Sequence, residues 1–313
     1  MKHCLQPLKP YLVAAKVAAV TVAITVAMSC NAQAATSSGL PWCDGVEASQ
    51  AMVAGQGPLE SIAFDHQGRM LFTNMLQSAL VRMSSPSATP AVIAKGLSSP
   101  GGIAVADADT AYVGTGNSLN GLIPQLGKAG IAKVNLQTGQ VSPVVMGLSM
   151  ANGVVRASDG TFYASDDLAA SLDRVLPDGK VERTWLKQNS NGLAISPDQK
   201  TLYVNQMIPA RVLAVNRNTG LTTVVAEAPA ARKWSWLDGL DIDDQGHLYV
   251  VSYWGGEVWR LSPTDGHMCL LVEGLLMPSA VAVGRSGLGF DPASVYITTH
   301  SGRVHRVPKA VPH

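Results

Sequence analysis

A motif of small residues followed by alternating apolar positions recurs six times along the chain. The copies align on one apolar position each: Ile62, Ile103, Val154, Leu193, Leu240 and Val281. These positions are 41, 51, 39, 47 and 41 residues apart. Self-similarity with so long a period is typical of folds that repeat one supersecondary unit, so the repeat constrains the architecture more than any other feature.

Each copy carries the signals of short antiparallel strands. Apolar and polar residues alternate, as at Ile62 and Phe64, and Gly, Asn, Asp or Pro turns separate the strands. Beyond the first 34 residues no stretch shows a convincing helical period with caps. Four short strands in a period of about 40–50 residues predict an all-β fold, a six-bladed β-propeller with four antiparallel strands per blade.

The two ends of the repeat array predict how the ring closes. The sixth copy ends near Val307 and lacks a fourth strand, which the segment 44–55 (DGVEASQAMVAG) can supply from the N-terminal side. We therefore expect the ring to be closed by the N-terminal strand. The long 51-residue spacing is explained by an insertion at 118–130 (SLNGLIPQLGKAG) in the second blade.

The first 34 residues have the pattern of a secretory signal peptide. Three lysines precede an apolar run at 17–28, and an Ala-Gln-Ala exit follows, which predicts cleavage after Ala34. The run is shorter than the roughly 20 residues of a membrane-spanning helix, and no other run is long enough. We expect a leader at 1–34, a single propeller domain at 35–313, and a periplasmic or secreted protein without an integral membrane span.

Export determines the interpretation of the cysteines. Cys4 and Cys30 belong to the leader, so Cys43 and Cys269 form the remaining pair. An even pair in an oxidising compartment predicts a disulfide, which would pin the N-terminal strand to the outer strand of blade five. Two alternatives stay open: the pair are buried thiols, or Cys30 is the lipid anchor of a lipoprotein.

Charge and motifs exclude several functions. The chain has 23 basic and 22 acidic residues, and its basic residues are scattered, which argues against nucleic acid as a partner. It contains no Gly-x-Ser-x-Gly nucleophile motif, which argues against a serine hydrolase. A small-molecule ligand is the remaining expectation, and a monomer is favoured over an oligomer.

A column of polar residues occurs two positions before each aligned apolar residue. Its members are Glu60, Gly101, Asn152, Asn191, Asp238 and Ser279, and each is followed by a small residue. This position begins the innermost strand of every blade, where side chains converge on the central channel and small neighbours let the backbones crowd.

Four of these residues carry oxygen donors, namely Glu60, Asn152, Asn191 and Asp238. Oxygen-only ligands favour a hard divalent cation, Ca²⁺ first and then Mg²⁺ or Mn²⁺, with Zn²⁺ the least favoured. The alternative is that the Asn-Gly and Asp-Gly pairs are ordinary turn dipeptides.

The segments SNGLAISPDQKTLYV and DGLDIDDQGHLYVVSYWGGEVWRLSP resemble the fourth and fifth blades of the regucalcin/gluconolactonase family of six-bladed propellers. The resemblance implies that Glu60, Asn191 and Asp238 hold a divalent cation and that Asn152 faces metal or substrate. A similar quartet occurs in the propeller diisopropyl fluorophosphatase. The implied activity is hydrolysis of a lactone or related ester at one calcium ion.

Two departures from the family pattern bear on the substrate. Blade one reads PLESIAFD instead of the Glu-Gly-Pro form of sugar lactonases, and Met150 stands where sugar-handling members place an arginine. We therefore expect an apolar or aromatic lactone. The candidate substrate-binding residues are Met150, Trp236, Tyr253, Trp254 and Met277, unless these are ordinary packing residues between blades.

The expected mechanism uses the cation to polarise the substrate carbonyl and to lower the pKa of bound water. Asp238 is the candidate catalytic residue, as ligand and general base. Asp166 and Asp167 are interpreted as solvated acids, with a helping role in catalysis as the alternative. The histidines His66, His247, His300 and His305 are interpreted as surface or edge residues.

Two rival functions stay open at this point. One is a non-catalytic exported propeller that binds a ligand or partner and keeps calcium as a structural plug. The other is a strictosidine-synthase-like propeller, which relies on a blade-six glutamate without metal, where this chain has Ser279.

Overall fold

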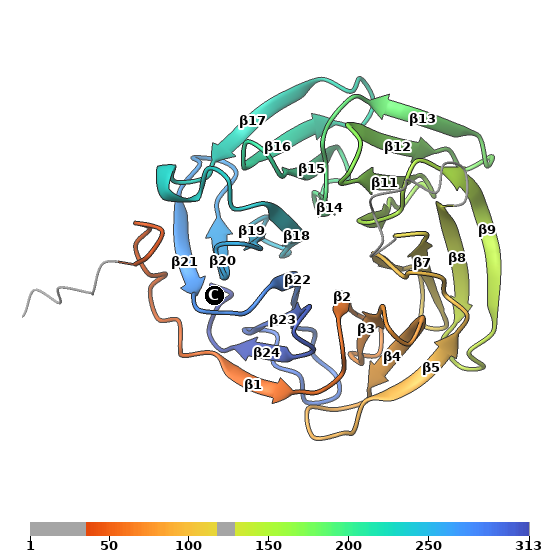
Figure 1. Ribbon diagram of the computed structural model, residues 1–313, viewed down its shortest axis with the longest axis horizontal. Coiled ribbons are helices and arrows are strands. Elements are labelled where there is room, and N and C mark those ends of the chain that lie inside the picture. Colours follow the sequence, from red (N-terminus) through yellow and green to blue (C-terminus); the bar gives the residue numbers. More distant parts are fainter. Residues whose placement is uncertain (1–35, 118–128, 313) are drawn as a thin grey trace, which may run out of the picture. The chain divides into compact units, whose positions relative to one another are not determined.

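A computed structural model describes residues 36–117 and 129–312. The expected leader and residues 118–128 of the expected insertion lie outside these described residues. Within them, 24 strands form six four-stranded antiparallel sheets arranged in a ring (Figure 1). The predicted six-bladed β-propeller is confirmed, and the described part of the chain contains one further element, the short 3₁₀ helix η1 (Ala230–Arg232).

The blades follow one another along the chain, each built from the inside outwards. Blade one contains β2 (Leu59–Phe64), β3 (Met70–Asn74), β4 (Ala79–Met83) and β5 (Ala91–Lys95). Blade two contains β6 (Ile103–Val105), β7 (Thr110–Thr115), β8 (Ala129–Asn135) and β9 (Val141–Leu148). Blade three contains β10 (Val154–Arg156), β11 (Phe162–Asp166), β12 (Ser171–Val175) and β13 (Val181–Leu186).

The second half of the ring repeats this order, except at its end. Blade four contains β14 (Leu193–Ile195), β15 (Thr201–Gln206), β16 (Arg211–Asn216) and β17 (Thr222–Glu227). Blade five contains β18 (Leu237–Ile242), β19 (Leu248–Ser252), β20 (Glu257–Leu261) and β21 (Met268–Val272). Blade six contains β22 (Pro278–Val283), β23 (Val295–Thr299), β24 (Val304–Val307) and β1 (Gln50–Val53).

The N-terminal strand closes the ring, as predicted. Strand β1 pairs antiparallel with β24, with Gln50 opposite Arg306 and Val53 opposite Val304. In Figure 1 the orange strand β1 accordingly lies beside the blue strand β24. Blade six is thus built from both ends of the domain, which ties residues near 50 to residues near 305.

A disulfide fastens the segment that precedes β1 to the neighbouring blade. Cys43 is bonded to Cys269 in β21, with 4.9 Å between their Cα atoms, which confirms the predicted pairing. The backbone N–H of Cys43 donates to the carbonyl of Leu270 at 2.9 Å, and Trp42 forms a β-bridge with the same residue. The N-terminal segment therefore crosses blade five before it completes blade six.

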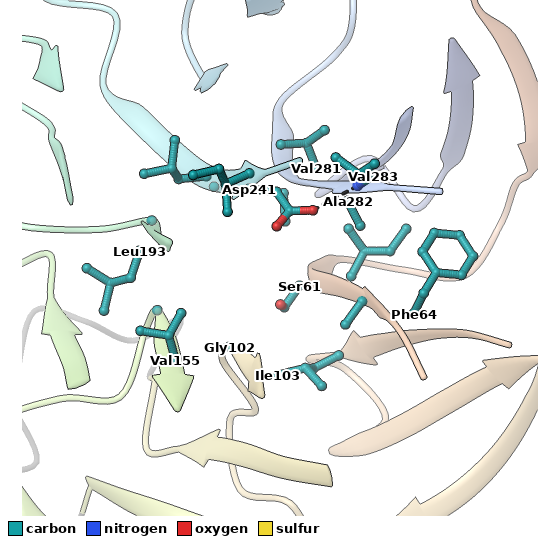
Figure 2. A pocket seen from close by; sticks show the side chains of 18 of the residues that line it. Ser61, Phe64, Gly102, Ile103, Val155, Leu193, Asp241, Val281, Ala282 and Val283 are labelled. Carbon is teal, nitrogen blue, oxygen red and sulfur yellow. Dashed lines mark hydrogen bonds between the residues drawn. The ribbon is translucent and has the colours of Figure 1, made fainter. Parts of the chain in front are cut away.

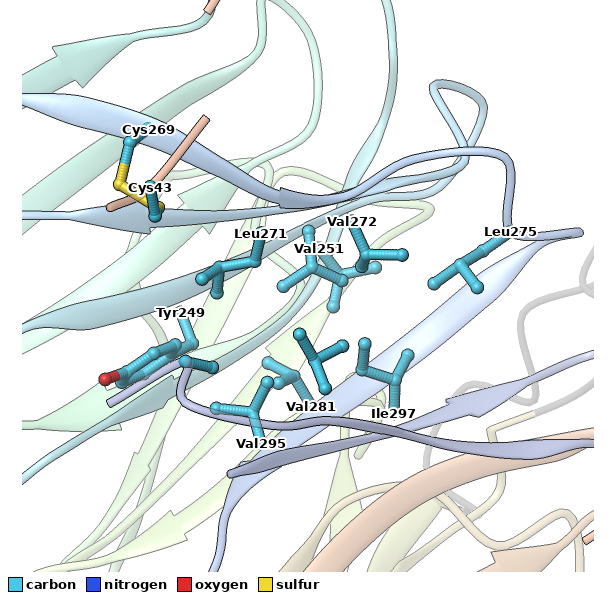
Figure 3. Close-up of a cluster of buried hydrophobic side chains, with 13 residues drawn as sticks. Cys43, Tyr249, Val251, Cys269, Leu271, Val272, Leu275, Val281, Val295 and Ile297 are labelled. Atoms are coloured by element: carbon cyan, nitrogen blue, oxygen red, sulfur yellow. A yellow bond between two sulfur atoms is a disulfide. The ribbon is translucent and has the colours of Figure 1, made fainter. Parts of the chain in front are cut away.

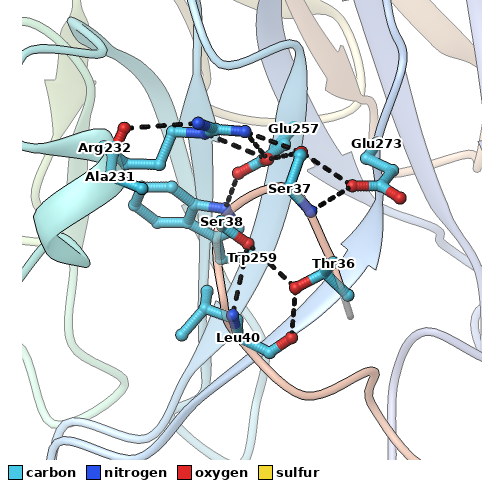
Figure 4. A network of polar contacts seen from close by, with 9 residues as sticks. All are labelled: Thr36, Ser37, Ser38, Leu40, Ala231, Arg232, Glu257, Trp259 and Glu273. Carbon is cyan, nitrogen blue, oxygen red and sulfur yellow. Dashed lines mark hydrogen bonds and ion pairs between the residues drawn. The ribbon is translucent and has the colours of Figure 1, made fainter. Parts of the chain in front are cut away.

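A polar clamp holds the first described residues of this segment (Figure 4). The fully buried Glu257 accepts hydrogen bonds from the hydroxyl of Ser37 at 2.8 Å and from the indole of Trp259 at 2.8 Å. Arg232 forms an ion pair with the same carboxylate at 2.6 Å. A buried charge is tolerated only when it is paired and hydrogen-bonded. The Glu257 carboxylate therefore favours the position in which Ser37 donates to it.

The hydrophobic core is divided among the interfaces between blades. Each of six buried clusters takes its side chains mainly from two adjacent blades. Figure 3 shows the cluster between blades five and six, where Tyr249 and Val251 pack near Val281, Val295 and Ile297. Both faces of a sheet are therefore buried against neighbours, which accounts for the low charge content of 14%.

The small residues beside the polar column allow the first strands to approach one another. A Cβ atom placed on Gly192 would lie 2.3 Å from the carbonyl oxygen of Asp238, and one on Gly102 would lie 2.3 Å from the backbone nitrogen of Val154. The N–H of Gly192 instead donates to that Asp238 carbonyl at 3.0 Å. The predicted crowding of backbones around the channel is confirmed.

Across the two described ranges, no helix has the length and hydropathy needed to span a membrane.

Candidate functional site

The polar column lines a central cavity. Glu60, Asn152, Asn191 and Asp238 each lie at or just before the start of the first strand of a different blade, are almost fully buried, and line a cavity of about 590 Å³. First strands of all six blades contribute to the wall. The repeat therefore brings together four side chains that are spread over 179 positions of sequence, from 60 to 238.

Deeper in the channel the wall is mostly apolar. Figure 2 shows Ile103, Val155 and Leu193 around the cavity, with the carboxylate of Asp241 on the opposite wall. Burial raises the pKa of Asp241 to about 6, and its Oδ2 atom accepts the backbone N–H of Val283 at 2.8 Å. Polar residues line both ends of the cavity: the polar column where the first strands begin, and Asp243, Asp244, Gln245 and Arg285 beyond the ends of β18 and β22.

The electrostatics of the site centre on Asp238. Burial, and then the negative charges of Glu60 and Asp167, raise the pKa of Asp238 well above its usual range, and hydrogen bonding from Asn191 only partly opposes this. Three carboxyl groups therefore share a buried region. Such an arrangement is costly without a compensating positive charge.

Both oxygens of Glu60 are held by neighbouring side chains. Its Oε1 atom accepts a hydrogen bond from Asn117 Nδ2 at 2.9 Å, and its Oε2 atom lies 2.5 Å from His300 Nε2. Asn117 Oδ1 in turn accepts a long hydrogen bond of 3.5 Å from Asn152 Nδ2. A chain of side-chain contacts thus connects blades six, one, two and three around the cavity.

A second ring of residues surrounds the polar column. It consists of the residues one or two positions beyond the end of each second strand, and we call it the outer ring: Met75, Asn117, Asp167, Met207, Tyr253 and His300. Antiparallel pairing places it beside the column, because Leu237 next to Asp238 pairs with Ser252 next to Tyr253. Two outer-ring residues already described, Asn117 and His300, are the partners of Glu60.

Asp167 of the outer ring belongs to the site, so its interpretation as a solvated acid is wrong. Burial, and then the charges of Glu60 and Asp166, raise the pKa of Asp167 to about 7, against an opposing hydrogen bond from Asn152. Asp166 is also buried, and its Oδ1 atom caps the turn by accepting the N–H groups of Leu168 and Ala169. The alternative, that Asp167 helps in catalysis, stays a prediction.

The expectation that His300 lies at the surface or an edge is wrong. Its side chain is 19% exposed and contacts Glu60 on one side and the hydroxyl of Tyr253 on the other. Burial lowers the pKa of His300, but the hydrogen bond with Glu60 and the charges of Glu60 and Asp167 outweigh it, so the pKa is raised. His66, by contrast, is exposed in a turn.

The five expected substrate-binding residues fall into different environments, and none of them lines the described cavity. Met150 is buried, whereas Trp236, Tyr253 and Met277 are half-buried. Trp254 is 65% exposed and packs edge-to-face on Tyr253, with 4.8 Å between ring centroids. Their role in binding substrate remains a prediction.

Exposed apolar side chains are concentrated on the face of the propeller where the polar column begins. We call them the apolar rim: Leu76, Leu168, Ile208, Trp234, Trp254 and Leu276. Each lies in a connection between second and third strands or before a first strand, and alternating strand direction puts these connections at the end where the polar column begins. In the described connections at the opposite end of the channel, the only large exposed apolar residues are Leu221 and Leu288.

The donor set fits a hard cation. Within the described residues no group of three or more His, Cys, Asp and Glu is arranged to hold a metal ion, and two of the four column donors are asparagine amides. Amide and carboxylate oxygens together are nevertheless typical calcium ligands. The buried, mutually repelling carboxyl groups of Glu60, Asp167 and Asp238 supply the negative charge that such an ion would neutralise.

Ser279 completes the column in blade six without contributing to this donor set. Its hydroxyl donates to the carbonyl of Leu59 at 2.6 Å and lies 3.2 Å from Thr298 Oγ1. The hydroxyl thus joins blade six to blade one. This structural use leaves no acidic group at the position on which a strictosidine-synthase-like mechanism depends.

Comparison with known proteins identifies similar chains. Residues 55–301 match the family model described as the SMP-30/gluconolactonase/LRE-like region. Among curated protein sequences, none matches the chain.

Solved structures with the same fold include the following three. A gluconolactonase from Xanthomonas campestris is 19% identical with a TM-score of 0.67, covering 83% of this chain and 89% of its own. A calcium-binding regucalcin from Agrobacterium tumefaciens is 17% identical with a TM-score of 0.66, covering 84% and 96%. A luciferin-regenerating enzyme is 17% identical with a TM-score of 0.64, covering 84% and 96%. At these identities the likeness extends to the fold alone.

Proposed function

Because the chain belongs to the SMP-30/gluconolactonase/LRE-like family, we propose that it is a metal-dependent hydrolase that opens a lactone or related ester. The observation that carries this proposal is the convergence of Glu60, Asn152, Asn191 and Asp238 on one cavity. These residues would hold the cation, and Ca²⁺ is the ion that their oxygen donors favour. A cation bound there supplies a Lewis acid that polarises the substrate carbonyl.

Asp238 and Asp167 have different proposed roles, as cation ligand and as general base. Asp238 is a ligand, and a carboxylate that is bound to a cation is a weak base. Asp167 has a pKa of about 7 without the ion, and a nearby positive charge would lower it, leaving the carboxylate ionised at neutral pH. Asp167 is therefore better suited than Asp238 to accept a proton from an attacking water.

The apolar rim supports an apolar or aromatic substrate. Six large exposed apolar side chains lie on the face where the cavity's polar column begins, and the half-buried Trp236 and Met277 precede the first strands of blades five and six. Met150 supplies no charge for the hydroxyl groups of a sugar acid. A substrate with an apolar substituent would cover part of the rim when its lactone ring enters the cavity.

The proposed enzyme is exported. The Cys43–Cys269 disulfide is of the kind that persists in oxidising compartments, and the leader pattern at 1–34 precedes the propeller domain at 35–313. We propose a periplasmic or secreted monomer.

A substrate panel tests this proposal. Sugar-acid, alkyl-substituted and aromatic lactones and esters are assayed with the wild type and with Asp238→Ala, in Ca²⁺ and in chelator. The expected result is turnover of apolar lactones that chelator abolishes, Ca²⁺ restores and the variant lacks. Undiminished hydrolysis in chelator would exclude the metal mechanism. Stabilisation by Ca²⁺ without turnover of any compound would favour a structural plug.

A further inference from the structure

Tyr253 and His300 form a hydrogen-bonded pair across the interface of blades five and six. The Tyr253 hydroxyl lies 2.9 Å from His300 Nδ1, and the two rings meet edge-to-face with 5.3 Å between centroids. On its other side, His300 Nε2 lies 2.5 Å from Glu60 Oε2. The pair thus reaches from the outer ring to one donor of the polar column.

The backbone holds both members of the pair in the same way. Tyr253 N–H donates to the carbonyl of Trp236 at 3.0 Å, and His300 N–H donates to the carbonyl of Met277 at 2.9 Å. Trp236 and Met277 stand two residues before Asp238 and Ser279 and have φ angles of +58° and +51°. Bulky residues rarely adopt this left-handed conformation, which persists where the surrounding structure requires it.

Hydrogen bonds at both ring nitrogens fix the orientation of the imidazole. Because the Glu60 carboxylate can only accept, Nε2 carries a proton and points at Glu60, whereas the Tyr253 hydroxyl can donate to Nδ1 of a neutral ring or accept from a protonated one. Asn117 holds the other carboxylate oxygen, so rotation of the carboxylate is prevented on both sides. Each carboxylate oxygen can accept more than one partner, so Glu60 is still able to bind a cation in this one orientation.

We propose that Tyr253 and His300 are positioning residues, which hold the Glu60 carboxylate in the orientation that binds the cation. This inference rests on the cation site of the proposed function. Residues that hydrogen-bond a ligating carboxylate typically change metal affinity by about 10–100-fold when they are replaced. Because Tyr253 contacts Glu60 only through His300, its effect should depend on the histidine.

Calorimetric titration with Ca²⁺ tests the proposal without reference to any substrate. We expect His300→Ala to weaken Ca²⁺ binding by about 10–100-fold. His300→Gln, whose amide nitrogen can replace Nε2 as a donor, should recover most of the affinity. Tyr253→Phe should weaken binding by a smaller factor and have no further effect in a His300→Ala background. The matched control His66→Ala removes an exposed imidazole and should bind as the wild type does.

The outcomes separate this proposal from the proposed function. If the wild type binds Ca²⁺ and His300→Ala binds it equally well, or if the glutamine variant is no better than alanine, the positioning role is wrong. A wild type that binds no Ca²⁺ overturns the cation site itself. Thermal unfolding in chelator checks that each variant is folded. If His300→Ala is not folded, Tyr253→Phe decides: weakened binding supports the proposal, and binding equal to that of the wild type overturns it.

Discussion

Asp167 and Asp238 are acids whose environment favours the neutral form in the absence of a cation. Burial is the first cause for each, and Glu60 adds repulsion in both cases. A buried carboxyl group with a raised pKa favours folding at low pH and opposes it once the unfolded chain ionises. Keeping these acids buried therefore lowers the stability of the cation-free protein, and the proposed cation would offset this cost.

This cost should be visible as a pH dependence. The pKa of Asp167 is about 7 in the folded protein and 3.8 as the ordinary value, so in chelator the free energy of unfolding should fall as pH rises between these values. The fall from this residue should be up to about 4 kcal/mol, because each pKa unit corresponds to about 1.4 kcal/mol. Chemical denaturation from pH 4.5 to 7.5 measures it.

Asp167→Asn should make this pH dependence shallower, leaving the parts due to Asp238 and Asp241, and should stabilise the cation-free protein at pH 7.5. Asp265→Asn, which replaces an exposed acid, should leave the slope as in the wild type. Equal slopes in the wild type and in Asp167→Asn would contradict the assignment of a raised pKa to Asp167.

At the level of strands, the sequence predicts the polar column but not the outer ring. Every column residue is followed by a small residue, because the first strands crowd one another, and this shared requirement makes the copies alike. The outer-ring positions are not restricted to one kind of residue, because the first strands do not crowd them. The residues there are Met75, Asn117, Asp167, Met207, Tyr253 and His300. Alignment finds positions that repeat, so it finds the fold and the candidate donors. The outer-ring residues differ from blade to blade, so alignment gives Asp167 and Tyr253 no shared role and misses the contacts of Asn117 and His300 with Glu60.

The crowding itself can be tested at Gly192, which immediately precedes β14. Gly192→Ala puts a methyl group 2.3 Å from the Asp238 carbonyl oxygen, so blades four and five must separate. Overpacking of this kind costs about 1–3 kcal/mol, and displacement of Asp238 should also weaken Ca²⁺ binding. Denaturation and calorimetry measure the two effects.

Gly179→Ala is the matched control for this substitution. Gly179 has a φ angle of +87°, but a methyl group added there would have no neighbouring atom within 4 Å, so alanine incurs backbone strain alone. We expect a moderate loss of stability and unchanged Ca²⁺ binding. If Gly192→Ala also binds Ca²⁺ like the wild type, close approach of the blades is not what places Asp238.

For the whole molecule, the critical feature is the seam at which the two ends of the propeller meet. The N-terminal segment contacts blade five through the Ser37 clamp and the Cys43–Cys269 disulfide, and then supplies β1 to blade six. The two cysteines are 226 residues apart in sequence. A crosslink over so long a loop strongly lowers the conformational entropy of the unfolded chain. The disulfide should therefore stabilise the folded ring.

Replacing both cysteines by serine should therefore destabilise the protein by about 2–5 kcal/mol. The measurement is denaturation of the double variant and of the wild type, each with and without reductant. Reductant should lower the stability of the wild type to that of the variant and leave the variant unchanged. Ser37→Ala, which removes one hydroxyl of the clamp but keeps the disulfide, should cost about 1 kcal/mol. If the serine variant is as stable as the oxidised wild type, the pairing of β1 with β24 and the packing between blades suffice to close the ring.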